Sequence, residues 1–181
     1  MVNAEDVIRI YALLSTHGIQ VWLNGGWGID ALLGEQTRPH KDLDIFVQLE
    51  DVIRMRDLLT RDGFSLKELW SENRWAIDLN QVKTATAFVL HDQEGRELDI
   101  HAIQFNERGD GVPAWEETKG LVIKKQGLAG MGLVDGVPVQ CISPQMQVLF
   151  HTGYKLPDIQ IWDLELLYKK FGVGNKKIIE D

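Results

Sequence analysis

Two aspartates separated by one residue, Asp42 and Asp44, have the spacing that points most directly to chemistry. The apolar residues Leu43 and Ile45 alternate with them, as in a β-strand whose successive side chains point to opposite faces. Both carboxylates would then share one face, where their like charges repel. A divalent cation between them would relieve that repulsion, and Mg²⁺ favours such carboxylates together with substrate phosphates. The pair predicts a metal site, although taken alone it also fits a solvated strand edge.

Two adjacent glycines, Gly25 and Gly26, lie between an apolar strand expected at 21–23 and a short helix expected at 27–33. At such a junction the backbone can approach a phosphate closely, and the N–H groups of the helix point at it. A tight turn that needs positive φ is the alternative for the glycines alone. The segment is neither a P-loop nor a dinucleotide fingerprint, because no Gly-Lys-Ser/Thr follows and the glycine spacing differs.

The elements that must position these residues alternate between helical and strand patterns without a long βαβ repeat. We therefore expect an α+β (mixed α/β) fold, with a mixed twisted sheet flanked by helices and with C-terminal helices. Apolar spacing, capping residues and turn signals predict the elements. The expected helices cover residues 5–17, 27–33, 50–61, a segment from Ser143, and 159–171; the expected strands cover 21–23, 43–47, 64–69, 85–90 and 97–103, with a hairpin around Asp135-Gly136.

The combined pattern of strand, two glycines, short helix, loop and apolar-flanked aspartates resembles the nucleotidyltransferase superfamily that includes DNA polymerase β. The match rests on Leu23, Gly25, Gly26, Asp42 and Asp44. This resemblance implies a third carboxylate on a later strand. Asp99 is the candidate, since it alternates with Leu98 and Ile100 and shares a face with His101.

Three segments, 22–30, 38–44 and 98–101, look like small lincosamide nucleotidyltransferases, and aminoglycoside 2''-nucleotidyltransferases share a looser form of the pattern. Residues 141–143 and 149–154 extend the resemblance. Asn24 departs from it, since these resistance enzymes commonly have Asp there. Residues 67–96 and 104–135, which should shape the acceptor pocket, match poorly. The resemblance thus concerns the nucleotide half of the reaction more than the acceptor.

By resemblance, the reaction is attack of a substrate hydroxyl on the α-phosphorus of a nucleoside triphosphate, with release of pyrophosphate. Asp42 and Asp44 would hold two Mg²⁺ ions, and Asp99 would ligate one of them, take the hydroxyl proton as a general base, or do both. Gly25 and Gly26 would approach the triphosphate. The nucleoside monophosphate is expected to be AMP from ATP.

A basic loop precedes the acidic pair and is placed to neutralise phosphate or pyrophosphate. Its members are Arg38, His40 and Lys41. Arg38 is the strongest candidate, because its guanidinium pairs with two phosphate oxygens. A basic loop on an acidic protein is the alternative. Asp30 either meets a cationic group of the substrate or pairs with Arg38, and we favour the pairing.

Residues 1–181 are expected to form one nucleotidyltransferase domain. Its core would cover about 18–105, its C-terminal hairpin and helices about 106–172, and a polar tail 173–181. The helices at 143–171 would either complete the acceptor cleft or form a homodimer contact. The sequence leaves these two roles open.

The composition argues against some classes of partner and some cellular locations. The net charge is −8 without a concentrated basic stripe, which argues against a duplex nucleic-acid binder. No run approaches the roughly 20 apolar residues of a membrane span. The N-terminal residues lack the pattern of a signal peptide, and Cys141 is the single cysteine, so a cytoplasmic setting is expected.

The leading hypothesis is a Mg²⁺-dependent transfer of a nucleoside monophosphate to a hydroxyl of a small molecule, such as a lincosamide or aminoglycoside antibiotic. Two alternatives keep the same fold. One is a nucleotidyltransferase that modifies a protein, as in toxin–antitoxin pairs, and the other is a non-catalytic nucleotide-binding module. A zinc hydrolase is disfavoured, because no His-Glu-x-x-His motif is present.

Overall fold

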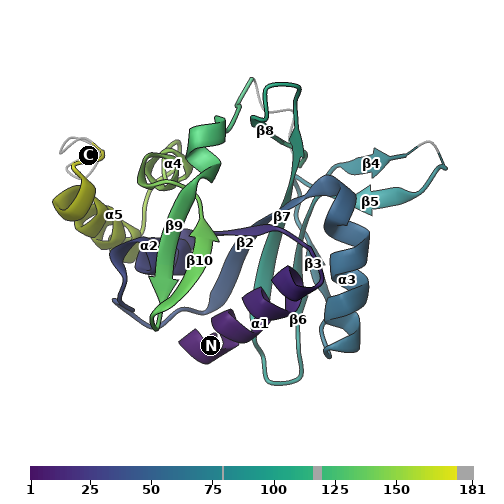
Figure 1. Cartoon of the computed structure of the whole chain (residues 1–181), viewed down its shortest axis with the longest axis horizontal. Helices are drawn as coiled ribbons and strands as arrows, with labels where there is room; N and C mark the ends of the chain where they lie inside the picture. The colour runs from purple at the N-terminus through teal and green to yellow at the C-terminus, as the bar shows by residue number, and fades with distance from the viewer. Residues whose placement is uncertain (79, 116–119, 175–181) are drawn as a thin grey trace.

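The computed structural model describes residues 1–78, 80–115 and 120–174 of the chain (Figure 1). The helices are α1 (Ala4–Thr16), α2 (Gly25–Leu33), α3 (Val52–Arg61), α4 (Pro144–Phe150) and α5 (Asp158–Phe171). The strands are β1 (Val21–Asn24), β2 (Asp42–Gln48), β3 (Ser65–Leu69), β4 (Trp75–Ile77), β5 (Lys83–Ala85), β6 (Ala87–His91), β7 (Glu97–Phe105), β8 (Gly111–Pro113), β9 (Gly130–Val134) and β10 (Val137–Cys141). The tail predicted at 173–181 lies outside the described residues from 175 onward.

The main sheet has the strand order β3-β6-β7-β2-β1-β10-β9, and β8 adds to β7. The pairs β2–β7 and β1–β10 are parallel, whereas the other pairs are antiparallel. Figure 1 shows α1 and α3 on one face of the sheet, with α2, α4 and α5 gathered beside β9 and β10. The predicted mixed α+β architecture is confirmed.

Local sequence signals explain where several elements begin and turn. Asn3 and Asp6 form a reciprocal capping box at the start of α1, which satisfies N–H groups that the helix leaves free. Ser143 caps α4 through a hydrogen bond from the Met146 N–H. The turn between β9 and β10 places Asp135 at positive φ, as the expected hairpin requires.

Two helices begin two residues away from the start that the sequence predicts. The helix expected at 27–33 begins two residues earlier, at Gly25, so both glycines belong to its first turn. The helix expected at 50–61 is preceded by a short 3₁₀ turn over Leu49–Asp51 and begins at Val52. Helix ends depend on a few weak interactions, which explains why periodicity alone misplaces them.

Strand register places three polar side chains in one row across the middle of the sheet. Asn24 on β1 lies opposite Asp44 on β2, and Asp44 lies opposite Asp99 on β7. On β2, Leu43 and Ile45 point to the other face, into the main core with α1 and α3. The pleat therefore separates the polar row from the main core.

A row of ring-containing side chains lies next to the polar row, two residues away from it on each of the same strands. Trp22, Phe46 and His101 are register partners on β1, β2 and β7. This face carries a second, smaller hydrophobic cluster, to which Trp115 and Phe150 add partly buried rings. The polar row thus lies beside an aromatic layer.

In the part of the chain that the structure describes, no helix combines the length and the apolar character needed to cross a bilayer.

Candidate active site

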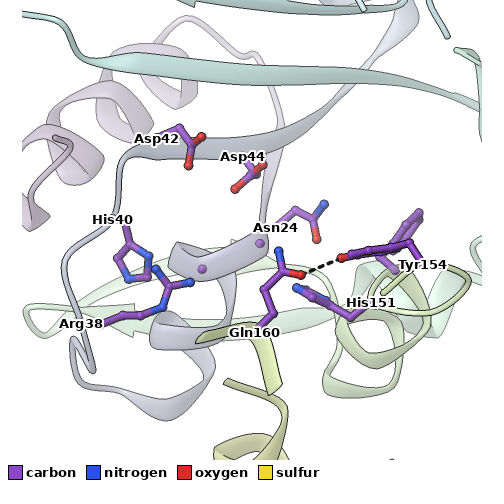
Figure 2. A pocket seen from close by; sticks show the side chains of 11 residues that line it. Asn24, Arg38, His40, Asp42, Asp44, His151, Tyr154 and Gln160 are labelled. Carbon is purple, nitrogen blue, oxygen red and sulfur yellow. Dashed lines mark hydrogen bonds between the residues drawn. The ribbon is translucent and has the colours of Figure 1, made fainter. Parts of the chain in front are cut away.

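A cleft of about 270 Å³ lies where β2 faces the start of α2 and the end of α4. Figure 2 shows Asp42 and Asp44 projecting from β2 on one side, with Arg38 and Gln160 across from them. The lining residues come from four stretches of the chain, 24–26, 38–44, 150–154 and 160: Asn24, Gly25, Gly26, Arg38, His40, Asp42, Asp44, Phe150, His151, Tyr154 and Gln160. Most of the predicted site residues therefore meet in one cavity.

Asp44 is the carboxylate most strongly affected by its surroundings. Burial raises its pKa well above the ordinary value, and the nearby charges of Asp99 and Asp42 raise it further. Asp99 follows the same pattern, and its pKa is raised to about 6. Burial is the main cause, and it outweighs a hydrogen bond from Trp70 that lowers the pKa. The negative charge of Asp42 acts on both Asp44 and Asp99, and a cation bound among these carboxylates would be stabilised.

Asp99 stands slightly apart from the other two acids. It is the direct register partner of Asp44 on β7, yet it does not line the cleft. Its Oδ1 accepts a hydrogen bond from Nε1 of Trp70 at 2.8 Å, and Nδ1 of His101 lies 3.4 Å from the same oxygen. Burial lowers the pKa of His101 to about 4, so this imidazole is neutral near pH 7.

The two glycines are required by what packs against them. A β-carbon on Gly25 would overlap the carboxylate of Asp44, and Gly25 also has a φ of 55°. A β-carbon on Gly26 would overlap the imidazole of His40 and crowd the guanidinium of Arg38. Their absent side chains therefore let the acidic strand and the basic loop approach the start of α2.

The first turn of α2 offers N–H groups to the cleft. Asn24 precedes this turn but makes no side-chain capping bond, and its Oδ1 is buried without a partner in the described structure. The leading N–H groups of a helix have no partner within the helix, and the helix dipole favours an anion there. Gly25 and Gly26 thus present a backbone suited to phosphate.

Replacing Gly25 with alanine is expected to destabilise the protein by about 1–2 kcal/mol more than replacing Gly34, at the other end of α2. Both glycines have positive φ, but a β-carbon on Gly34 meets nothing within 4 Å, whereas one on Gly25 meets Asp44. Urea unfolding of the two variants measures the difference. Equal losses would show that Asp44 moves aside at no cost.

The basic loop is held by buried acids. Arg38 donates from Nε and one terminal nitrogen to Asp163 on α5, at 3.0 and 2.6 Å from its two oxygens. Its pKa is raised, chiefly by that hydrogen bond. His40 pairs with Asp30, and Asp30 also accepts a hydrogen bond from Thr37. The expected pairing of Asp30 with Arg38 is wrong, because each residue takes a different partner.

Lys41 does not join the other two members of the loop at the cleft. Its ammonium lies 3.2 Å from Glu97 and is largely exposed. Glu97 also pairs with Lys67, so Lys41 belongs to a surface ion-pair cluster beside the site. Lys41 lies at a bend between His40 and β2, and its side chain points to Glu97, whereas His40 and Asp42 reach the cavity.

Two lining residues, Phe150 and Gln160, were not identified from the sequence. Gln160 accepts a hydrogen bond from the hydroxyl of Tyr154 at 3.0 Å, drawn as a dashed line in Figure 2. Nδ1 of His151 bonds to the carbonyl of Gln147 at 2.7 Å, which leaves Nε2 as the free ring nitrogen. Phe150, His151 and Tyr154 lie at or just after the end of α4, in the stretch 149–154 that extends the resemblance. Gln160 lies on α5, and no local motif marks it.

The residues present fit a magnesium site in which the protein supplies only some of the oxygen ligands. Within the described residues, no three histidine, cysteine, aspartate or glutamate side chains gather closely enough to hold a metal by themselves. Mg²⁺ is usually held by one or two carboxylates, with waters and substrate phosphates completing the shell. Asp42 and Asp44 in the cleft, beside the unpartnered Oδ1 of Asn24, match that requirement.

Comparison with known proteins supplies independent evidence of the family to which the chain is related. The chain matches the aminoglycoside-2''-adenylyltransferase family over residues 6–167. It is 28% identical over 166 residues to a lincosamide resistance protein of Staphylococcus haemolyticus, covering 92% of this chain and 94% of that protein. A 2''-aminoglycoside nucleotidyltransferase of Escherichia coli is 43% identical, but over only 37 residues.

Solved structures agree with these matches. The crystal structure of the lincosamide antibiotic adenylyltransferase LnuA, lincomycin-bound, has a TM-score of 0.76 and 27% identity, covering 92% of this chain and 96% of that one. The aminoglycoside enzyme ANT(2'')-Ia, in complex with adenylyl-2''-tobramycin, has a TM-score of 0.66 at 19% identity, covering 98% and 92%. The second likeness concerns the fold alone.

Proposed function

The chain belongs to the aminoglycoside-2''-adenylyltransferase family and is a nucleotidyltransferase, and from that membership we propose that it moves AMP from ATP to a hydroxyl of a lincosamide-type antibiotic with the help of Mg²⁺. The observation that carries the proposal is the cleft in which Asp42 and Asp44 face Arg38 beside the first turn of α2. Paired carboxylates opposite a phosphate-binding helix start suit a metal–triphosphate complex.

In this proposal, the nucleotide half of the site works as follows. The N–H groups of Gly25 and Gly26 bind triphosphate oxygens, and Arg38 adds positive charge from the opposite wall. The Asp163 carboxylate fixes the guanidinium of Arg38 before substrate arrives, which reduces the ordering cost of binding. The buried His40–Asp30 pair holds the loop that carries Arg38 against α2.

Asp42 and Asp44, with Asp99 beside them, would hold divalent cations. When bound, such ions neutralise charge on the phosphates and stabilise the oxygens of the attacking and leaving groups. Asp99 lies on the strand next to Asp44, away from the helix that binds phosphate, so it is placed to accept the proton of the acceptor hydroxyl. Its raised pKa makes it a stronger base than an exposed aspartate.

Two features favour a lincosamide over an aminoglycoside as acceptor. In pairwise sequence matches, the lincosamide resistance protein covers nearly the whole chain, whereas the 2''-aminoglycoside nucleotidyltransferase of Escherichia coli covers a 37-residue segment. The neutral His101, which lies next to Asp99, packs in an aromatic layer with Trp115 and the buried Phe46. Aminoglycosides are polycations, and an uncharged aromatic wall offers them little, whereas it suits an acceptor with an apolar part.

The test is a panel of lincosamides and aminoglycosides incubated with each of the four NTPs and Mg²⁺, with pyrophosphate release and product mass as readouts. The proposal expects a mass increase of one AMP on a lincosamide, lost when EDTA is added. Transfer to an aminoglycoside alone would overturn the acceptor, and transfer from another NTP would overturn the donor.

An assay with labelled NTP separates the two alternatives, a protein-modifying enzyme and a binding module. Label on a protein band would favour a protein-modifying enzyme, and nucleotide binding without any product would favour a binding module. A cytoplasmic location accords with the use of ATP and forms part of the proposal. The homodimer and the absence of a nucleic-acid partner stay predictions, to be checked by sedimentation and by a DNA-binding assay.

A further inference from the structure

Trp70 reaches Asp99 from two strands away. It follows β3 directly, and its backbone N–H donates to the carbonyl of Ala87 on β6 at 3.3 Å. Asp99 lies on β7, beyond β6, where its register partner is Val89. The indole Nε1 nevertheless donates to Oδ1 of Asp99 at 2.8 Å. The side chain therefore crosses the intervening strand to make this contact.

The residue that Trp70 crosses is small. Ala87 is fully buried and is the register partner of His101. With only a methyl group at that position, the indole of Trp70 can stack with the ring of His101, at 6.3 Å between centroids. Strands in a sheet are about 4.8 Å apart, so a side chain must be as long as tryptophan to span two of them.

The hydrogen bond fixes one oxygen of the Asp99 carboxylate. Trp70 donates to Oδ1, and Nδ1 of His101 lies 3.4 Å from that same atom. A carboxylate has two oxygens, so the orientation of the group is set while Oδ2 is left to the site. His101 is itself held between Trp70 and Trp115, whose ring lies 4.8 Å away.

We propose that Trp70 is a positioning residue of the nucleotidyl transfer, and that its indole N–H holds the Asp99 carboxylate in the orientation that receives the acceptor hydroxyl. This inference rests on the proposed function and adds a role that the sequence did not indicate, since Trp70 lies in the segment 67–96 that matches the family poorly. An apolar ring at this position would fill the space but would leave the carboxylate free to rotate.

The experiment compares Trp70→Phe with Trp75→Phe, a matched control on the exposed strand β4. Misplacing a reacting group costs up to about 100-fold in rate, so we expect kcat of Trp70→Phe to fall by about 10- to 100-fold. The KM for the NTP should change less than about twofold, because the triphosphate contacts are intact. Trp75→Phe should behave as wild type.

A double-mutant cycle with Asp99→Asn decides whether Trp70 acts through Asp99. If it does, Trp70→Phe/Asp99→Asn loses no more activity than Asp99→Asn alone. The Trp70 indole N–H resonance should also shift in Asp99→Asn, whether or not the enzyme turns over. Additive losses, or wild-type kcat in Trp70→Phe, would overturn the inference while leaving the proposed function intact. A wild-type protein without transfer activity would overturn both.

Discussion

Asp44→Asn and Asp42→Asn are each expected to lower the rate of nucleotidyl transfer by roughly 10³-fold or more. Each replacement keeps the shape of the side chain but removes a negative charge from the cleft wall that faces Arg38 and the start of α2. The cation that these carboxylates would hold carries the charge stabilisation of the transition state, so the loss should appear in kcat. Initial rates of pyrophosphate release measure it.

The matched control is Asp57→Asn on the exposed side of α3, which should leave the rate unchanged. Circular dichroism and thermal melting establish that the two site variants remain folded. If Asp44→Asn retained more than about a tenth of wild-type activity, its carboxylate would not be needed for the metal, and the proposed site would be wrong.

Without divalent cations, the wild-type protein is expected to lose stability relative to Asp99→Asn as the pH rises from about 4 to about 6. Asp99 has a pKa of about 6 in the folded protein, against an ordinary value of 3.8. An acid whose pKa is raised on folding binds its proton more tightly in the folded state. Folding stability therefore falls with rising pH between the two values and stays lower above the upper one.

The size of the effect follows from the same two pKa values. A tenfold change in proton affinity is about 1.4 kcal/mol, so Asp99 alone accounts for about 3 kcal/mol in metal-free protein. For a protein of this length that corresponds to roughly 6–12 °C in melting temperature. Asp44 is affected in the same direction by burial and by the charges of Asp99 and Asp42. The charged forms of Asp44 and Asp99 are thus expected to destabilise the metal-free protein.

Melting curves in EDTA between pH 4 and 8 measure this effect, with Glu107→Gln at an exposed position as control. Asp92, Glu97 and Asp110 have lowered pKa values, so they act in the opposite sense, and mainly below pH 4. Added Mg²⁺ should raise the melting temperature more at pH 7 than at pH 5. His101, whose pKa burial lowers to about 4, acts in the opposite sense over the same range, so the readout is the difference in melting temperature between wild type and Asp99→Asn. A difference that stays constant between pH 4 and 6 would contradict the prediction.

The sequence by itself determined most of the helices and strands and the main residues of the proposed nucleotide-binding wall. Alternation around Asp42 and Asp44 fixes a strand with both acids on one face, because a strand has a side-chain period of two. Gly25 and Gly26 were predicted to lie at a strand–helix junction, and the structure gives the reason: Asp44 and His40 occupy the space of their missing side chains. Both inferences depend on residues close together in the chain.

The tertiary structure decided which residues pair and which reach the cleft. Arg38 pairs with Asp163 and His40 with Asp30, whereas Lys41 turns to Glu97. Gln160 enters the cleft from α5, and Trp70 reaches Asp99 across β6. These contacts join segments up to 125 residues apart, and no local pattern of charge or hydrophobicity encodes them. Strand register and helix packing set them, because only those place distant side chains within hydrogen-bonding distance.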